Sequence, residues 1–554
     1  MPDEIHDVVV IGSGAGGGPL AYELSNAGAR VLVLEKGRAL KHEELIHDEL
    51  KICRSDFFVP NVEDEPHVVV RDGGKPERSS LGWIASCVGG GTVHMSGFFL
   101  RLKPEDFQLR TLAGDIPGAS VIDWPLRYAD LAPYYDRVER VIGVSGLAGI
   151  NPFEEPRSGP YPFPPLDEHP MAKEIDRVCG PLGYHPFPTP RAILTRPVGE
   201  RSLCSYCALC GSYGCEMGAK GSTAVSVLPA AVATGRCEIR PDCMAYRVEV
   251  GPTGLATGVL YLDEQGRERR ARGRAIVVSC SAIESARLLL NSDSSLFPDG
   301  LANGEGQVGQ NLIFSNHCDG KARFSITGQS ARRPWLSSKE PFVHRCVQDF
   351  YFTPRPDCPK GGTLSFLFTH PNPIGGGLRQ AFGEDGSIVF GQGLKDRMRE
   401  RLRDSVNLEF ELFAESLPNP GMHVTIDPDA TDRWGIASAR LTLHHHPLDQ
   451  LAAEAVYEKG MEILQALEPD EVAPNYGFGE SAILQHGTCR FGLDPRSSVL
   501  DRDCRAHSVP NLYVVDGGFM PTCGGVPTTM TIMANSFRVG ERLGEAFRRR
   551  EIPG

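Results

Sequence analysis

Hydrophobic and polar positions are most sharply segregated near the N-terminus of this chain. The apolar run Val8–Ile11 leads into a glycine-rich turn, and a helix-like segment then leads into a second apolar run that closes at Glu35. A short apolar run bounded by a glycine-rich turn is typical of a buried strand. Residues 7–36 are therefore predicted to fold as strand, turn, helix and strand.

Farther along the chain, apolar residues alternate with polar ones in several short segments. Such alternation predicts strands that are buried on one side. After a predicted helix near 222–234, the segments 237–250, 256–263 and 274–280 are expected to form a small antiparallel layer and a return to the main sheet.

The region 316–440 contains strand-like runs between proline and glycine turns, which indicates a second domain built on an antiparallel sheet. These runs are Gly362–His370, Val406–Glu415 and Met422–Asp427. Helical apolar patterns occur at Leu451–Leu467 and from about Thr529 to Arg549. The stretch 108–200 is rich in proline and shows few clear periodic runs.

Length and charge narrow the class of protein. A chain of 554 residues is too long for one small core, so two or more domains are expected. The formal net charge of −13 argues against nucleic acid or an anionic membrane surface as the main partner. No apolar stretch approaches the ~20 residues of a membrane span, and the acidic N-terminus lacks the features of a secretory signal. A cytoplasmic location is expected.

Gly12, Gly14 and Gly17 form a G-x-G-x-x-G pattern between the predicted first strand and the predicted helix. In that context the first glycine makes a tight turn, the second lets the backbone approach a pyrophosphate, and the third lets the helix pack close to the strand. The helix N-terminus supplies free N–H groups to the phosphates. Glu35 stands roughly 20 residues on, where an acid binds a ribose hydroxyl. We predict a dinucleotide site, with further contacts from Ala15, Gly16 and Lys36.

Several other segments resemble those of the glucose–methanol–choline (GMC) family of FAD-dependent oxidoreductases. The segment Val88–His94 is similar to the family's second glycine loop. The other similar segments are Ser279–Ser285, Val308–Leu312, His486–Gly492, Asn511–Asp516 and Pro521–Met533. Because the matches extend over nearly the whole chain, it is identified as a member of this family.

The resemblance implies an α/β fold in which a Rossmann-like FAD-binding domain is interleaved with an α+β substrate domain built on an antiparallel sheet. The FAD-binding domain would comprise 1–45, 84–110, 220–315 and 470–554, and the substrate domain 46–83, 111–219 and 316–469. The implied reaction is hydride transfer from an alcohol carbon to flavin N5, while a base takes the hydroxyl proton. The implied substrate is a sugar, glycoside, sterol or aryl alcohol.

The resemblance also implies further cofactor contacts. These are Gly90, Gly91, Thr92 and His94 in the second glycine loop, Ser281, and Asp516, Gly517, Thr528 and Thr529 near the C-terminus. His94 stands where some relatives attach the flavin covalently. The alternatives for His94 are a side chain that packs and hydrogen-bonds beside the flavin ring, and a catalytic role.

The chain departs from the family pattern at the usual catalytic pair. The expected histidine is replaced by Leu484, and the expected His or Asn is replaced by Pro527. Neither side chain can donate or accept a proton. If the segment is extended, His486 shares the face of Leu484 at a displacement of roughly 6–7 Å along the strand. His486 is therefore predicted to be the general base, with a packing role as the alternative.

A dense cysteine cluster consists of Cys204, Cys207, Cys210 and Cys215. Thiolates at C-x2-C-x2-C spacing suit an iron–sulfur cluster, and zinc is another metal that such ligands bind. Some members of the family carry an iron–sulfur centre in such a place and pass electrons to a partner subunit. Metal-free thiols or a disulfide are the alternative, and the proline that often follows the last ferredoxin cysteine is absent. The four cysteines are candidate ligands, and an electron-accepting partner protein would then be expected.

Three functions are compatible with the sequence. The first is an FAD-dependent dehydrogenase or oxidase acting on a small-molecule alcohol. The missing catalytic pair motivates the second, a flavoprotein of the same fold that acts as a lyase or isomerase. A flavin-bound structural or partner-binding subunit is the third. Reduction of FAD by a substrate in the absence of oxygen separates the first function from the other two.

Overall fold

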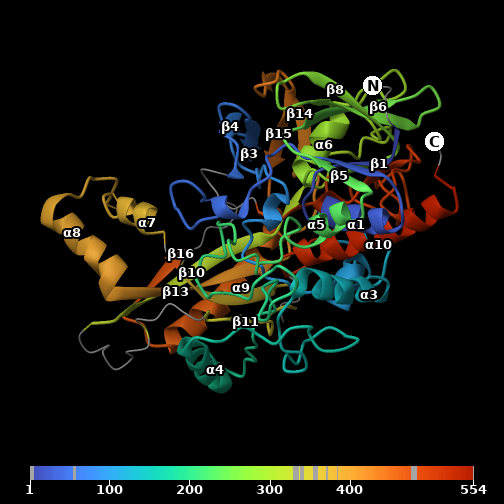
Figure 1. The fold of residues 1–554 in the computed structure, drawn as a ribbon. Coiled ribbons are helices and arrows are strands. Elements are labelled where there is room, and N and C mark those ends of the chain that lie inside the picture. Colours follow the sequence, from blue (N-terminus) through green and yellow to red (C-terminus); the bar gives the residue numbers. More distant parts are fainter. Residues whose placement is uncertain are drawn as a thin grey trace.

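The fold was obtained as a computed structural model (Figure 1). The structure describes residues 5–53, 58–327, 336, 342–352, 360–369, 372–383, 385–475 and 483–552. His370, the last residue of one predicted strand, lies outside this range.

The largest sheet has seven strands in the order β5-β2-β1-β8-β7-β6, with β18 paired to β8. Its strands are β1 (Ile5–Ile11), β2 (Val31–Leu34), β5 (Cys237–Arg240), β6 (Met244–Val250), β7 (Ala256–Leu262), β8 (Glu268–Val278) and β18 (Leu512–Val514). β5, β2, β1, β8 and β18 run parallel, whereas β6, β7 and β8 are antiparallel neighbours. The strand–turn–helix–strand prediction for 7–36 is confirmed.

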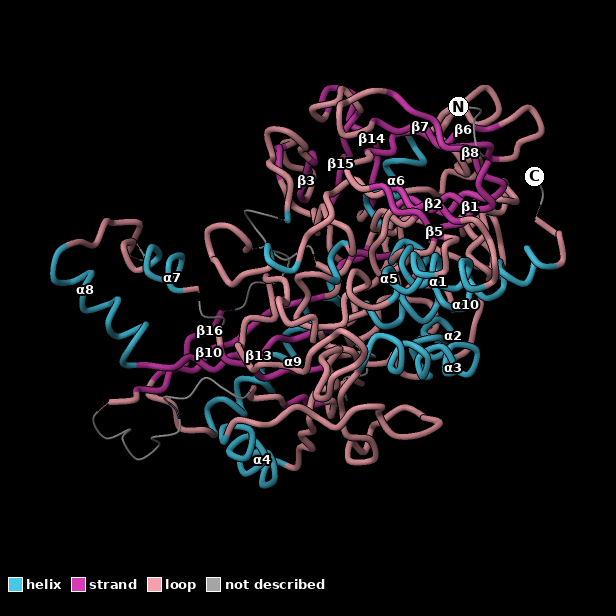
Figure 2. The backbone as a smooth tube through the Cα atoms, viewed as in Figure 1, coloured by secondary structure: helices cyan, strands magenta, loops and turns pink. Residues whose placement is uncertain are grey.

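Helices α1 (Gly17–Asn26), α5 (Val227–Ala233) and α10 (Thr529–Arg548) gather against one side of this sheet, and α3 (Tyr128–Val138) packs on α10 (Figures 1 and 2). The segments Val8–Ile11 and Val31–Leu34 are buried throughout, as a sheet covered by helices requires. α6 (Ala282–Leu290) contacts β6 of this sheet and β14 of a neighbouring one.

A second sheet of five strands has the order β11-β12-β13-β10-β16 and is antiparallel. Its strands are β10 (Asn316–Ser325), β11 (Arg345–Val347), β12 (Gly362–Phe368), β13 (Ser405–Ala414) and β16 (Glu471–Asn475). Helices α4 (Pro170–Leu182) and α9 (Pro447–Ala466) share one apolar core with its residues Cys318, Leu364 and Leu412. Because side chains alternate along a strand, His317 and Asp319 face the other way.

Two smaller sheets complete the described structure. One pairs β14 (His423–Thr431), β15 (Ala437–Leu443), β3 (His67–Arg71) and β4 (Glu77–Ser79), and the other pairs β17 (Gln485–His486) with β9 (Ile313–Phe314). The helices α2 (Leu109–Ala113), α7 (Pro373–Arg379) and α8 (Gly391–Arg399) lie outside the sheets, and α7 and α8 project from the body in Figure 1. In the described part of the chain, no helix is both long and apolar enough for a membrane span.

The predicted fold class, a parallel-rich sheet with helices combined with an antiparallel second sheet, is confirmed. The stretch 108–200, in which the sequence shows few periodic runs, contains the helices α3 and α4. Both helices contain proline, which obscured their periodicity: Pro133 lies inside α3, and Pro170 and Pro181 lie in α4. The exact domain boundaries stay a prediction.

Candidate cofactor and active site

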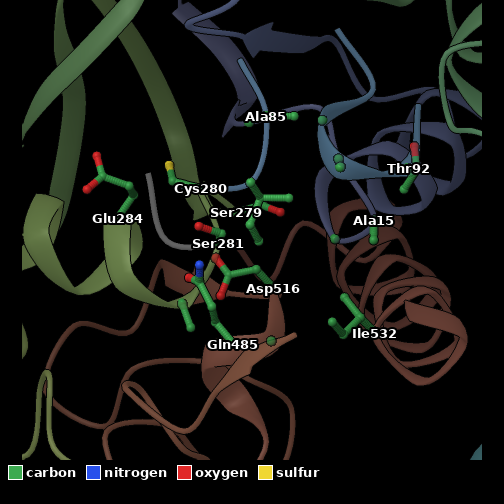
Figure 3. Close-up of a pocket in the computed structure, with 18 of the residues that line it drawn as sticks. Ala15, Ala85, Thr92, Ser279, Cys280, Ser281, Glu284, Gln485, Asp516 and Ile532 are labelled. Atoms are coloured by element: carbon green, nitrogen blue, oxygen red, sulfur yellow. The ribbon is translucent and has the colours of Figure 1, made fainter. Parts of the chain in front are cut away.

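A cavity of about 490 Å³ opens where β1, β2 and β8 end. In open α/β sheets, ligands bind outside the carboxyl ends of the strands. Figure 3 shows Ser279, Ser281 and Asp516 close together, with Ala15 and Thr92 on other segments across from them. The cavity also extends to the second sheet, because His317, Glu411 and Phe413 line it.

The three glycines of the first loop meet different surroundings. Gly12 has φ +96°, and a Cβ there would lie 2.1 Å from the carbonyl oxygen of Ser279. A Cβ on Gly17 would lie 1.9 Å from the carbonyl oxygen of Gly12. At Gly14 the nearest protein atoms would be 3.9 Å away, and Gly14 lines the cavity. Glycine is thus required at Gly12 and Gly17 because neighbouring backbone atoms leave no space for a Cβ, whereas glycine at Gly14 leaves room for a ligand.

Glu35 and Lys36 line the cavity just beyond β2. The Glu35 carboxylate accepts hydrogen bonds from Ser13 N (3.0 Å), Ser13 Oγ (2.6 Å) and Gly37 N (2.9 Å). Burial raises the pKa of Glu35, and these hydrogen bonds oppose the rise. The Lys36 ammonium contacts Glu65 at 2.6 Å and lies 3.8 Å from the centre of the Trp83 ring. Glu35 is therefore held by the loop that carries the glycines.

The second glycine loop borders the cavity through Gly90, Gly91, Thr92 and His94. Thr92 Oγ1 donates to Gly89 O at 2.6 Å and accepts from Thr223 N at 3.1 Å. His94 Nε2 lies 3.0 Å from Ile84 O, and the imidazole packs against Phe58 with ring centres 5.2 Å apart. The environment of His94 is that of a packed, hydrogen-bonded histidine at the cavity wall.

The C-terminal segments supply Ser281, Asp516, Gly517, Thr528 and Thr529 to the cavity wall. The Asp516 carboxylate accepts hydrogen bonds from Ser285 Oγ and from Gly518 N. Burial raises the pKa of Asp516 to about 6. Thr528 and Thr529 stand at the first turn of α10, where free N–H groups favour a polar or anionic ligand.

His486 does not lie where the sequence predicted it. Leu484 lines the cavity with φ +55°, so the backbone turns and is not extended from Leu484 to His486. His486 is fully buried behind the cavity wall, with Nε2 2.6 Å from Thr528 Oγ1. Burial lowers its pKa to about 3. The predicted shared face is wrong, and His486 acts here as a packed partner of Thr528.

The four clustered cysteines lie in a loop that reaches the cavity through Gly211 and Ser212. Cys204 Sγ accepts from Tyr206 N at 3.3 Å, and Cys207 Sγ lies 3.8 Å from His47 Nε2. Cys204, Cys210 and Cys215 belong to one apolar cluster. Across the described residues, no group of three or more His, Cys, Asp or Glu side chains is placed to hold a metal ion. The geometry gives the predicted metal site no support.

Sequence reasoning missed the contribution of the second sheet. His317 and Phe413 are paired across β10 and β13, and Glu411 faces the cavity two residues before Phe413. Burial and the charges of Glu409 and Asp319 raise the pKa of Glu411 to about 8. The alternation of apolar and polar residues along 316–325 and 405–414 could have predicted that these residues share one face of the sheet. It could not have predicted that this face borders the cavity.

The cavity fits a dinucleotide. Its glycine at position 14 leaves open the space that a Cβ would fill, and the buried Ser279 Oγ makes no hydrogen bond with any residue that the structure describes. A largely parallel sheet with a cavity at the carboxyl ends of its strands, covered by an antiparallel sheet, is typical of the class of dinucleotide-binding proteins.

Comparison with known proteins makes the class specific. Residues 77–317 and 418–536 match the GMC oxidoreductase family, and residues 7–43 match an FAD binding domain. The chain is 34% identical to paromamine 6'-oxidase of Streptomyces fradiae over 97% of its own length and 91% of that protein. It is 31% identical to 2-methyl-1,2-propanediol dehydrogenase of Mycolicibacterium austroafricanum, over 98% and 95% of the two chains.

Solved structures agree on the fold. A formate oxidase variant from Aspergillus oryzae RIB40 matches with a TM-score of 0.66 and 13% identity over 100% of both chains. Pyridoxine 4-oxidase from Mesorbium loti matches with a TM-score of 0.59 and 16% identity over 98% of this chain and 99% of that one. The chain belongs to the GMC oxidoreductase family, and it is an FAD-dependent enzyme.

Proposed function

We propose that this enzyme oxidises an alcohol group of a small, hydroxyl-rich substrate such as a sugar, a glycoside or a diol. The observation that carries the proposal is the continuity of the cavity, which joins the glycine loops to the polar face of the second sheet. Relatives named for the oxidation of paromamine and of 2-methyl-1,2-propanediol support this substrate class over a sterol or an aryl alcohol.

Different residues of the cavity would bind different parts of FAD. Gly14 and the N-terminus of α1 would hold the pyrophosphate, and Glu35 would accept a hydrogen bond from a ribose hydroxyl. The second glycine loop and Thr528 would lie along the flavin. When bound, FAD supplies a two-electron acceptor for the hydride of the alcohol carbon. The role of the second sheet is to bind and orient the alcohol.

Turnover with an artificial electron-accepting dye tests the proposal. Purified protein is incubated with a panel of polyols, sugars, sterols and aryl alcohols, and dye reduction is measured together with the carbonyl product. We expect dye reduction with polyols or sugars and one carbonyl per two electrons. Conversion of a substrate without dye reduction would instead favour a lyase or isomerase, for which the relatives above offer no support.

Three finer expectations from the sequence stay predictions. They are an iron–sulfur cluster at the four cysteines, an electron-accepting partner protein and a cytoplasmic location. Iron and acid-labile sulfide analysis of protein purified without air tests the first. Loss of both in a Cys207→Ser variant would establish it, and their absence from the parent protein would leave the cysteines as thiols.

A further inference from the structure

We infer that His317 on β10 accepts the hydroxyl proton of the substrate alcohol, the role that Leu484 and Pro527 cannot perform. This inference rests on the proposed alcohol oxidation. Leu484 and Pro527 occupy the positions of the family's usual catalytic pair, and both line the cavity. The side chains at these two positions are therefore apolar. A proton acceptor must then come from another wall.

The backbone just before His317 contacts Leu484. Ser315 N donates to Leu484 O at 3.3 Å, and β17 pairs with β9 immediately before β10 begins. His317 follows Ser315 by two residues, a rise of roughly 7 Å along an extended chain. Its side chain lines the same cavity as Leu484.

The end of β13 contacts the segment that carries Pro527. Glu415, directly after β13, accepts hydrogen bonds from Cys523 N at 3.0 Å and Gly524 N at 3.1 Å. Two residues earlier, Phe413 is the cross-strand partner of His317, with ring centres 5.4 Å apart. His317 thus lies close to both chain segments that carry the substituted positions.

The imidazole of His317 is in a chemical state that can accept a proton. The His317 ring has no hydrogen-bonding partner in the described part of the chain. Because His317 lines the cavity, its ring nitrogens are available to a ligand bound there. Burial lowers the pKa of His317 below its usual value, Asp319 opposes this change, and Lys321 adds to it. The imidazole is therefore neutral at pH 7 and has a free nitrogen lone pair.

Other charged groups surround the same space. Glu409 and Glu411 project from β13 on the face of His317. Arg191 lies 5.1 Å from the centre of the ring of Phe98, which lines the cavity, and His94 also lines it. Glu411 is the competing acceptor. Because its pKa is raised to about 8, its carboxyl is mostly protonated at pH 7 and is therefore the poorer proton acceptor there.

The O–H bond of the alcohol breaks and its proton goes to an imidazole nitrogen of His317. The O–H electron pair forms the C=O bond, while the hydrogen on the same carbon leaves with its electron pair to oxidised FAD. The products are a carbonyl compound, reduced cofactor and an imidazolium that releases its proton to solvent.

The test uses the FAD-loaded full chain in three variants: His317→Gln, Glu411→Gln and, as a matched control, the exposed His444→Gln. Rates of anaerobic flavin reduction are measured between pH 6.5 and 9.5 with an alcohol that reduces the parent. We expect His317→Gln to be slower by about 10²–10⁴-fold with unchanged FAD content and melting temperature. The parental rate should stay level above pH 7, and His444→Gln should match the parent.

Two outcomes would overturn the inference. One is parental reduction by His317→Gln. The other is a parental rate that rises through a pKa near 8 and is lost in Glu411→Gln, which would make Glu411 the base. If no alcohol reduces the parent, the proposed function fails instead. An NMR titration of the histidine side chains needs no turnover and still tests the protonation state of His317. The signal that is missing from the spectrum of His317→Gln is assigned to His317, and its chemical shift should be that of a neutral imidazole at pH 7. The shift of a cationic imidazole at pH 7 would refute the inference.

Discussion

At the scale of single residues, Gly14 and Gly17 belong to one loop but have opposite structural requirements. A methyl group on Gly14 would enter the cavity without touching protein atoms closer than 3.9 Å. A methyl group on Gly17 would collide with the backbone of Gly12 at 1.9 Å. The same substitution should therefore separate ligand binding from folding.

We predict that Gly14→Ala in its FAD-free form has the parental melting temperature, but that it binds FAD at least about tenfold more weakly, a loss of about 1.4 kcal/mol. Gly17→Ala should lower the stability of the FAD-free protein by about 1–3 kcal/mol or more, because overpacking strains the backbone. Flavin absorbance and thermal melting measure both effects. Equal FAD binding by Gly14→Ala and the parent would contradict the role assigned to Gly14.

Glu411 predicts a pH dependence of stability. Its pKa rises from 4.5 to about 8 on folding, so the folded protein binds more protons than the unfolded chain between these values. The contribution of the protonated Glu411 carboxyl to the free energy of unfolding is fully present below pH 4.5 and is lost as the pH rises through 8. Glu411→Gln lacks this loss, so its advantage over the parent in free energy of unfolding should grow from pH 5 to 9, reaching on the order of 2–4 kcal/mol. A constant difference would show that Glu411 titrates normally.

At the scale of elements, Lys220 ties the cysteine-rich loop to the second glycine loop. Its buried ammonium donates to Met95 O (2.9 Å), Cys210 O (2.6 Å) and Tyr213 O (2.7 Å). Burial lowers the pKa of Lys220 to about 8. One cation thus satisfies three backbone carbonyls from two segments.

Lys220→Met should leave these carbonyls without their donor and cost about 1–3 kcal/mol for each that stays buried and unsatisfied. Because Met95 lines the cavity, FAD release should also become faster. Thermal melting and flavin release measure the two effects, and Lys173→Met on the exposed side of α4 is the control. A variant with parental values for both would show that the loop holds its position without Lys220.

The sequence was most informative about elements whose signals are local. The turn at Gly12, the acid at Glu35 and the second glycine loop were all assigned to one site, and each lines the same cavity. His486 was misplaced because one left-handed residue, Leu484, changed the direction of the chain. His317 and Glu411 were missed because their approach to the cavity depends on the pairing of β10 with β13 across some 90 residues.

At the scale of the whole molecule, a buried ion cluster joins the parts of the chain that form the site. Lys360 pairs with Asp106 and with Glu415 at the end of β13, and Glu415 also holds the backbone of Cys523 and Gly524. Tyr351 donates to Asp106 at 2.6 Å. The second sheet and the C-terminal segment are thereby fixed together, which keeps the cavity continuous between them.

The most direct measurement is the flavin absorbance of the FAD-loaded protein after anaerobic mixing with a hydroxyl-rich substrate such as 2-methyl-1,2-propanediol or a sugar. Oxidised flavin should disappear while one carbonyl product forms per flavin, since the alcohol is the only reductant present. Dithionite serves as the positive control for reduction. Flavin that dithionite reduces, but that stays oxidised with every alcohol of the panel, would contradict alcohol oxidation by this enzyme.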